Sequence, residues 1–298
     1  MASARANPLR PPSRPVELQD PLNRFVYHPL AARLARLLVP TGISPNLVSV
    51  GSALCLLAAT WSFVMLAPPA NWSVGLGFML LWHVVDGADG DLARMTQRAS
   101  ATGELVDGVC DIFGNVVMYF AFAFWLDDVM GGWAWALAWS AGGSHVLQLN
   151  HAETQRRLYQ WRVYGKPWLG MAAESGDAVF RRESWFSRYF SFWAVGYVWL
   201  SKRLTGTANP IDEALATAGP EERDRIRAIV RRHAGFSLLL EKALGGNPKT
   251  FVIAASVALG GPYLYFMTTL LPLNLILLIS LLHHKRMERR IVAEIRAG

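Results

Sequence analysis

Six acidic residues stand close together in an otherwise apolar part of the sequence. They are Asp86, Asp89, Asp91, Glu104, Asp107 and Asp111. The runs before and after them, ALCLLAATWSFVMLA and VVMYFAFAFWL, are apolar enough to lie in a membrane. A carboxylate near the middle of a membrane-spanning helix costs about 2.5–3.5 kcal/mol on insertion scales. Acids at these positions therefore point to a specific chemical role.

Four of these acids form two pairs, each on one face of a helix. Asp86 and Asp89 are three residues apart, and Asp107 and Asp111 are four apart. Two antiparallel helices joined by a short link can bring the pairs together, and four converging carboxylates would repel one another. Divalent cations remove this repulsion, and oxygen ligands favour Mg²⁺, Mn²⁺ or Ca²⁺. The spacing predicts a site for two metal ions, which suits phosphoryl chemistry.

Small residues and one arginine accompany the first acid pair. Gly87, Gly90 and Ala93 leave one side of the helix without bulky side chains, so a large ligand can approach the backbone. Arg94, one turn beyond Gly90, can bind a phosphate through two hydrogen bonds. Acids for metal, a bare helix surface and an arginine together favour a nucleotide diphosphate site.

Two alternatives were weighed for the acids. An EF-hand calcium loop needs an acid or amide at its third position and a glutamate at its twelfth, where this chain has Ala88 and Gln97. A cation or proton pathway in a transporter also places acids in a membrane. A pathway, however, does not require the register of glycine, alanine and arginine that accompanies these acids.

The composition predicts that membrane helices carry these residues. The chain has 298 residues, of which 52% are hydrophobic and 17% charged, whereas soluble domains carry about 25% charged residues. Several apolar runs reach the roughly 20 residues that span a bilayer. The sequence therefore predicts an all-α integral membrane protein. Its net charge of +7 is attributed to basic cytoplasmic loops rather than to a nucleic-acid partner.

Six transmembrane helices are predicted, preceded by an amphipathic helix over residues 21–40 that lies in the membrane interface. The predicted spans are about 46–66, 72–95, 103–126, 133–150, 251–268 and 270–284. This topology leaves all 29 Lys and Arg on the cytoplasmic side or at its edge, with both termini and the acids facing the cytoplasm. Residues 184–203 are predicted to be an interfacial helix, because a seventh span would move basic residues outside.

The order of the acidic and small residues resembles the signature of the CDP-alcohol phosphotransferases. It reads Asp86-x2-Asp89-Gly90-x2-Ala93-Arg94-x8-Gly103-x3-Asp107-x3-Asp111, and no element of the signature is missing. The resemblance covers roughly residues 44–150, and the six spans with an interfacial N-terminal helix also resemble that family. The segment 151–249 does not obviously match it.

The resemblance implies a metal site and a general base. Asp86, Asp89 and Asp107 would hold two divalent ions, Mg²⁺ or Mn²⁺. Asp111, at the edge of the metal site, would also reach the metal and act as general base on the hydroxyl group of the acceptor.

The resemblance also implies a nucleotide pocket. Gly90, Ala93 and Arg94 would border the cytidine diphosphate, with Arg94 stabilising charge during transfer. Gly103 would allow close packing of helices beside the nucleotide. Asn46 and Ser49 stand where the family often has an Asn and a Thr that line this pocket.

Two acids are extra to the signature. Asp91 is expected to face the cytoplasm in contact with solvent. Glu104 is expected to cap the start of the third span, where the helix dipole favours an acid.

The expected parts of the chain follow from this assignment. They are a disordered tail and interfacial helix over 1–43, a four-helix catalytic membrane core over 44–150, a cytoplasmic or interfacial insert over 151–249, two further spans over 250–284 and a basic cytoplasmic tail over 285–298.

The expected activity is metal-dependent transfer of a phospho-alcohol or phosphatidyl group from a CDP-linked donor to an alcohol acceptor, with release of CMP. At least one of the two substrates would be a lipid. The donor is either CDP-diacylglycerol or a CDP-linked small alcohol. The stretch GELVDGVCD resembles GELFDHGCD of the choline/ethanolamine branch, whereas Arg156 and Arg157 could serve an acceptor that carries a phosphate. The family commonly forms homodimers. The alternative from a different class is an acid-lined transporter or a non-catalytic membrane protein.

Overall fold

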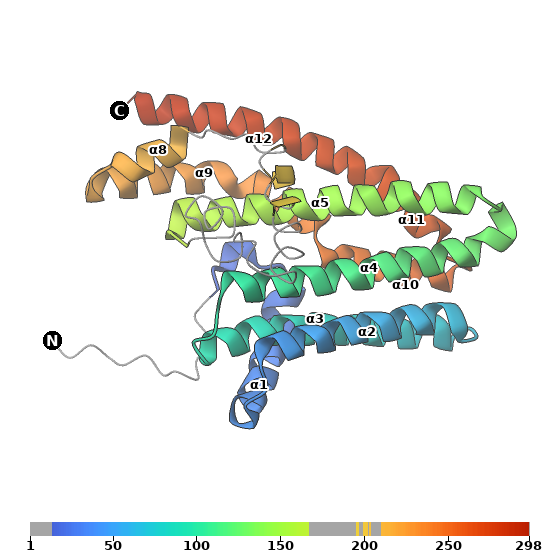
Figure 1. The fold of residues 1–298 in the computed structure, drawn as a ribbon. Coiled ribbons are helices and arrows are strands. Elements are labelled where there is room, and N and C mark those ends of the chain that lie inside the picture. Colours follow the sequence, from blue (N-terminus) through green and yellow to red (C-terminus); the bar gives the residue numbers. More distant parts are fainter. Residues whose placement is uncertain (1–13, 167–194, 197–198, 202, 204–209, 298) are drawn as a thin grey trace. The chain divides into compact units, whose positions relative to one another are not determined.

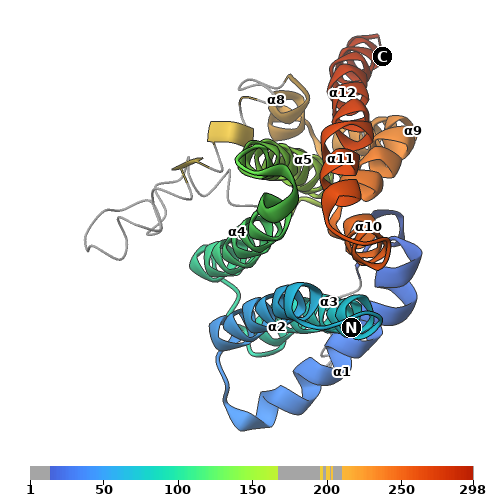
Figure 2. The ribbon, with the colours of Figure 1, turned by 90° about the vertical axis from the view of Figure 1, so that its right-hand side faces the viewer.

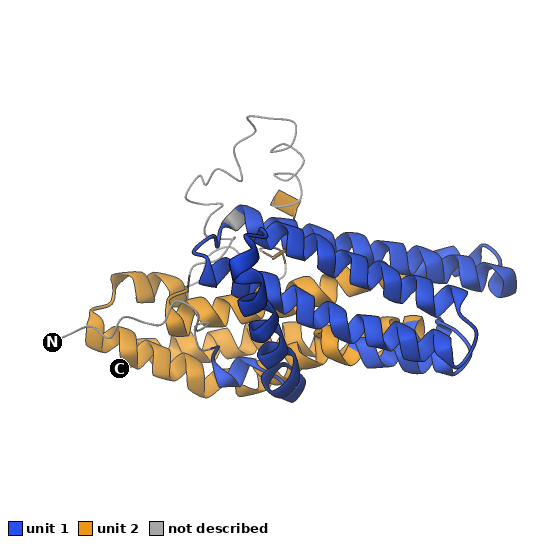
Figure 3. Ribbon diagram, turned by 90° about the horizontal axis from the view of Figure 1, so that it is seen from below, with its two compact units in different colours: residues 1–139, 249–265 blue, residues 140–248, 266–298 orange. Residues whose placement is uncertain are grey.

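The computed structural model describes residues 14–166, 195–196, 199–201, 203 and 210–297 (Figure 1). Within these residues every regular element is helical and none is a strand. The predicted all-α class is therefore confirmed. The chain forms two compact units, residues 1–139 with 249–265 and residues 140–248 with 266–298 (Figure 3), and each is considered by itself.

The helices of the first unit are α1 (His28–Leu38), α2 (Pro45–Met65), α3 (Ala70–Met95), α4 (Ala101–Met130) and most of α10 (Gly246–Ala258). The second unit contains most of α5 (Trp133–Tyr164), then α8 (Pro210–Thr217), α9 (Pro220–Leu244) and α12 (Pro272–Arg296). The short α11 (Tyr263–Leu270) precedes α12.

Three helical segments of the described chain are long and apolar enough to cross a membrane. They are Pro45–Met65, Thr102–Met130 and Tyr263–Arg296. The first two correspond to the predicted first and third spans, and each has a serine N-cap. The side chain of Ser44 accepts a hydrogen bond from the amide of Leu47, and that of Ser100 accepts one from the amide of Gly103. The complete six-span topology stays a prediction.

The predicted boundary between the fifth and sixth spans is wrong. The sequence placed a turn near residues 268–270, but α10 already ends at Ala258 and the chain turns at Gly260 and Gly261. Both glycines have positive φ angles, of 112° and 155°, which side chains disfavour. At Pro272, by contrast, helical hydrogen bonds continue on either side, from Leu271 N–H to Met267 O and from Leu275 N–H to Leu271 O.

In the first unit, α2 packs against α3 and α4 at positions that only glycine can occupy. A Cβ atom at Gly75 of α3 would lie 2.3 Å from the ring of Phe63, and one at Gly114 of α4 would lie 2.6 Å from the side chain of Leu56. Phe63 and Leu56 are both fully buried. The two glycines therefore set how closely these helices approach.

The amphipathic helix crosses α3 rather than running along it (Figures 1 and 2). Its small face, with Ala31 and Ala35, is buried against Ala88 and Leu92 of α3. The opposite apolar side chains stay exposed, for example Leu37 at 72%. An exposed apolar face on a helix of this kind fits the predicted position in the membrane interface.

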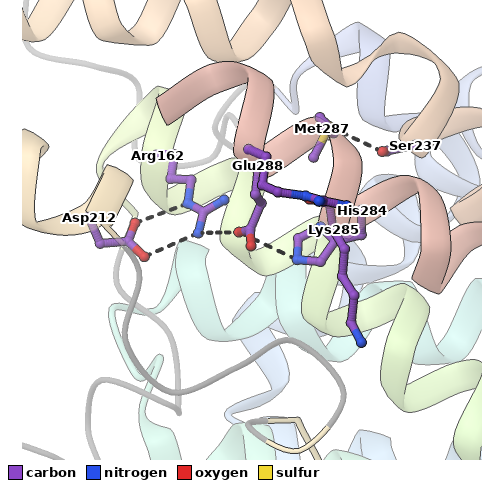
Figure 4. A network of polar contacts seen from close by, with 8 residues as sticks. Arg162, Asp212, Ser237, His284, Lys285, Met287 and Glu288 are labelled. Carbon is purple, nitrogen blue, oxygen red and sulfur yellow. Dashed lines mark hydrogen bonds and ion pairs between the residues drawn. The ribbon is translucent and has the colours of Figure 1, made fainter. Parts of the chain in front are cut away.

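The second unit is held together at one end by a buried arginine (Figure 4). Arg162 of α5 is 3% exposed and forms ion pairs with Asp212 of α8 and Glu288 of α12, both at 3.0 Å. Because its charge is enclosed, both carboxylates are needed to compensate it. Helix α5 thus continues well beyond Asn150, where the fourth span was predicted to end. The interfacial helix predicted over 184–203 lies outside the described residues, apart from a few positions near its end.

Candidate active site

Three of the predicted metal ligands lie together. One carboxylate oxygen from each of Asp86, Asp89 and Asp107 lies within 4.8 Å of the other two. The first two come from the last turns of α3, and Asp107 comes from the second turn of α4. The short connection between these helices brings the pairs into contact, as the spacing predicts.

The state of two of these oxygens fits a metal ion. Oδ1 of Asp86 and Oδ1 of Asp107 are both buried, and neither has a hydrogen-bond partner among the described residues. A buried carboxylate oxygen without a partner is unfavourable. Oxygen ligands at this mutual distance match the preference of Mg²⁺ and Mn²⁺, so the donor set can hold such an ion.

The third carboxylate is held by a serine of the neighbouring helix. Oγ of Ser49 in α2 donates a hydrogen bond of 2.5 Å to Oδ2 of Asp89, and both residues are buried. The sequence had suggested Ser49 as a nucleotide contact. In the structure its hydroxyl reaches an acid of the cluster instead, which makes it a partner that orients Asp89.

The predicted general base, Asp111, lies one turn along α4 from Asp107. Its Oδ1 accepts a hydrogen bond of 3.1 Å from Nε1 of Trp82 in α3. Trp82 was not selected from the sequence, because a tryptophan in an apolar run carries no pattern that separates a hydrogen-bonding role from a packing role. The indole holds one oxygen of Asp111.

The arginine of the signature folds back along its own helix. The terminal nitrogens of Arg94 lie 3.3 Å from the position that a Cβ atom would take at Gly90. Nη2 of Arg94 donates a hydrogen bond of 2.6 Å to Oδ1 of Asp91. The side chain of Arg94 remains 38% exposed, so a phosphate can reach it. Ala93, between these residues, is half-buried.

The expectation for Asp91 is wrong. Its side chain is 2% exposed, and besides Arg94 it binds Arg14 from the N-terminal segment at 2.7 Å. The sequence alone could not show this, because Arg14 lies 77 residues away in the chain.

Gly103 and Asn46 are neighbours where α4 and α2 begin. A Cβ atom at Gly103 would lie 3.6 Å from Oδ1 of Asn46 and 3.3 Å from Oγ of Ser100. The hydrogen bond that caps α4 comes from Ser100, while Glu104 lies in the first helical turn. Glu104 is therefore placed where the dipole favours an acid, but it is not the capping residue.

The two arginines considered for a phosphate-bearing acceptor lie in the second unit and share one acid. Glu153 accepts hydrogen bonds from Nη2 of Arg156 at 2.6 Å and from Nε of Arg157 at 2.5 Å. Burial raises the pKa of Glu153, but the two guanidinium groups outweigh it and hold that pKa at about 2. Glu153 thus compensates part of the positive charge that the acceptor hypothesis requires.

Comparison with known proteins agrees with the geometry. Residues 42–169 match the family model of the CDP-alcohol phosphatidyltransferases. The chain therefore belongs to this family through that domain, and it is a membrane-bound transferase enzyme of phospholipid synthesis. A search of curated proteins finds no match for the chain.

Proposed function

We propose that the protein transfers a substituted phosphate group from a CDP-linked alcohol to the hydroxyl group of a second alcohol in a reaction that depends on Mg²⁺ or Mn²⁺. The observation that carries this proposal is the convergence of Asp86, Asp89 and Asp107 beside Arg94. At least one substrate is a lipid, since the acids lie on helices that also carry long apolar faces. The donor is CDP-diacylglycerol or a CDP-linked small alcohol.

In this proposal Asp86, Asp89 and Asp107 hold the divalent ions, with Asp111 at the edge of the metal site. Bound there, the ions would neutralise the charge of the donor diphosphate. The bare surface at Gly90 and Ala93 admits the cytidine diphosphate, together with Asn46 at the start of α2. These residues bind and orient the donor, so that positioning and electrostatics supply most of the rate enhancement.

Two side chains act on the reacting groups themselves. Asp111 takes the proton from the acceptor hydroxyl, whose oxygen then attacks the phosphorus distal to cytidine. Trp82 orients Asp111 through the hydrogen bond to Oδ1. Arg94 stabilises the negative charge that develops on the phosphoryl oxygens. The bond between the two phosphates breaks, and CMP leaves while a phosphodiester forms.

The orientation and assembly are part of the same proposal. The acids and both termini face the cytoplasm, where CDP-linked compounds and CMP are soluble, and two copies of the chain pair as a homodimer.

The test is CMP release by the purified full-length protein in detergent, with CDP-diacylglycerol, CDP-choline or CDP-ethanolamine as donor and a panel of alcohol acceptors. Release that requires Mg²⁺ or Mn²⁺ and is abolished by EDTA is expected with one class of donor, and mass spectrometry identifies the product. An Asp107→Asn variant serves as the inactive control. If the folded protein neither releases CMP nor binds any CDP compound, the proposal is wrong.

A further inference from the structure

A buried carboxylate next to the signature joins two arginines, and one of them lies outside the signature. Oδ1 of Asp91 accepts hydrogen bonds from Nη2 of Arg94 and from Nη2 of Arg14. Asp91 is 2% exposed, whereas the side chains of Arg14 and Arg94 keep 29% and 38% exposure. The carboxylate is therefore enclosed, while both guanidinium groups are open to solvent or to a ligand.

The position of Arg14 is fixed by further contacts of its own segment. Nε2 of Gln19 donates hydrogen bonds to the carbonyl oxygens of Arg14, at 2.8 Å, and of Pro15, at 3.3 Å. Oε1 of Gln19 in turn pairs with Nδ1 of His28, at the start of α1, at 2.9 Å. The segment before α1 is thus tied both to α1 and, through Asp91, to α3.

The charges of this group do not balance. Asp91 contributes one negative charge, and the two guanidinium groups that share its Oδ1 contribute two positive charges. Because both groups contact the same oxygen, they lie side by side. The surplus positive charge lies next to Gly90, where Arg94 covers a helix surface that carries no side chain. Adjacent guanidinium groups bind phosphate oxygens well, since each offers paired N–H donors.

We propose that Arg14 is a second arginine of the donor site, and that Arg14 and Arg94 together bind the diphosphate of the CDP-linked donor. Asp91 is the positioning residue that holds the two guanidinium groups beside each other. This inference rests on the proposed function, because it assigns residues to the same donor site. It extends that site to the segment before α1.

The test measures the binding of CDP and of CMP, in the presence of Mg²⁺, to purified full-length protein by titration calorimetry. The Arg14→Gln variant is expected to bind CDP about tenfold more weakly, the loss expected for one charge-assisted contact, with a smaller change for CMP. The matched control is Arg24→Gln, which removes an arginine whose guanidinium lies over the ring of Phe25, 5.1 Å from its centre. This control is expected to bind both nucleotides as the wild type does.

A purely structural ion pair would give a different result. It would lower the melting temperature of Arg14→Gln and leave the preference for CDP over CMP unchanged, and that outcome overturns the inference. Should Arg14→Gln not be monodisperse, Arg14→Lys replaces it, because it keeps the charge and loses the paired donors. An intermediate loss of CDP affinity is then expected, and unchanged affinity contradicts the inference.

The role of Asp91 has a separate readout. Asp91→Asn is expected to raise the KM for the donor with a smaller effect on kcat, and adding Arg14→Gln should then have little further effect. Fully additive losses would show that Asp91 does not position Arg14. A wild type that binds no CDP would remove the proposed function along with this inference, whereas unchanged CDP binding by Arg14→Gln would remove the inference alone.

Discussion

At the scale of single residues, the site depends on side chains that act through the acids. Ser49 is buried in α2 and gives its hydroxyl hydrogen to Asp89, and Trp82 gives its indole hydrogen to Asp111. Partners that orient metal ligands commonly change metal affinity 10–100-fold when they are removed, as an order of magnitude. Both residues should therefore affect activity without contacting the substrate.

Replacing Ser49 is expected to weaken the metal site. In Ser49→Ala, Asp89 loses its hydrogen bond from α2, so the Mg²⁺ or Mn²⁺ concentration for half-maximal CMP release should rise about 10-fold or more. Ser49→Thr keeps the hydroxyl and should behave as the wild type. The control is Ser62→Ala in the same helix, where the hydroxyl only bonds the carbonyl of Ala58. An unchanged metal requirement in Ser49→Ala would show that this hydrogen bond does not orient Asp89.

Replacing the proposed base is expected to stop transfer without unfolding the protein. Asp111→Asn keeps the size of the side chain and an oxygen for Trp82, but it removes the group that accepts the proton. CMP release should fall by at least about 100-fold, while the melting temperature and CDP binding stay close to those of the wild type. Turnover at the wild-type rate would show that Asp111 is not the base.

At the scale of the elements, close helix contacts place the acids. Glycines of α3 and α4 let these helices approach α2 so closely that a single methyl group would collide with a buried side chain. Cores tolerate such insertions poorly, because the surrounding side chains must leave their preferred rotamers.

Gly75→Ala should therefore destabilise the protein. The added Cβ would lie 2.3 Å from the buried ring of Phe63, and the expected loss is about 1–3 kcal/mol. Gly77→Ala, two residues along the same helix, meets no atom within 4 Å and should be neutral or stabilising, because alanine favours helix more than glycine does. Thermal unfolding of the two variants in the same detergent measures the difference. Equal melting temperatures would show that α2 and α3 are not held this closely.

The signature itself could be located from the sequence, because its residues repeat at helical spacing on two neighbouring helices. The spacing of Asp86, Asp89 and Asp107 was sufficient to predict that their carboxylates meet. Contacts from distant parts of the chain could not be predicted this way. Neither the pairing of Arg14 with Asp91 nor the hydrogen bond from Trp82 to Asp111 leaves a periodic pattern.

The helix boundaries show the same limit. A proline was expected to end the fifth span, but Pro272 stands at the start of α12, where it does not need its missing amide hydrogen. The turn is instead made by Gly260 and Gly261, whose positive φ angles depend on backbone geometry that a hydropathy pattern does not report.

At the scale of the whole molecule, stability should depend on pH through a buried acid. Burial raises the pKa of Glu241 in α9 from its ordinary value of 4.5 to about 8, and nearby Glu153 adds to the effect. Between these values the folded protein holds a proton that the unfolded chain has released. The free energy of unfolding should therefore fall as the pH rises from about 5 to about 8.

The variant Glu241→Gln tests this dependence, because it carries no charge at any pH. It should melt at nearly the wild-type temperature at about pH 5 and at a higher temperature than the wild type at about pH 8.5. The control Glu221→Gln, at an exposed position of the same helix, should shift neither value. If wild type and Glu241→Gln change in parallel with pH, Glu241 is not the group responsible.

The proposed orientation in the membrane can be tested by labelling. Single cysteines introduced by Gly132→Cys, between α4 and α5, and by Arg98→Cys, between α3 and α4, should lie on opposite faces of the membrane. On intact cells an impermeant maleimide should label only the first, and after permeabilisation it should label both. The unsubstituted chain, with Cys55 and Cys110, gives the background. Labelling of Arg98→Cys from outside would reverse the orientation.

The contact between α1 and α3 has a consequence for how the enzyme meets its substrates. Ala31 of α1 lies 3.1 Å from the position of a Cβ atom at Gly87, one residue beyond Asp86. With α1 in the interface, as predicted, this contact holds the acids at the depth of the lipid head groups. A lipid substrate then arrives by lateral diffusion, with its head group already at the right height. The reaction rate should consequently follow the mole fraction of that lipid in the bilayer rather than its bulk concentration.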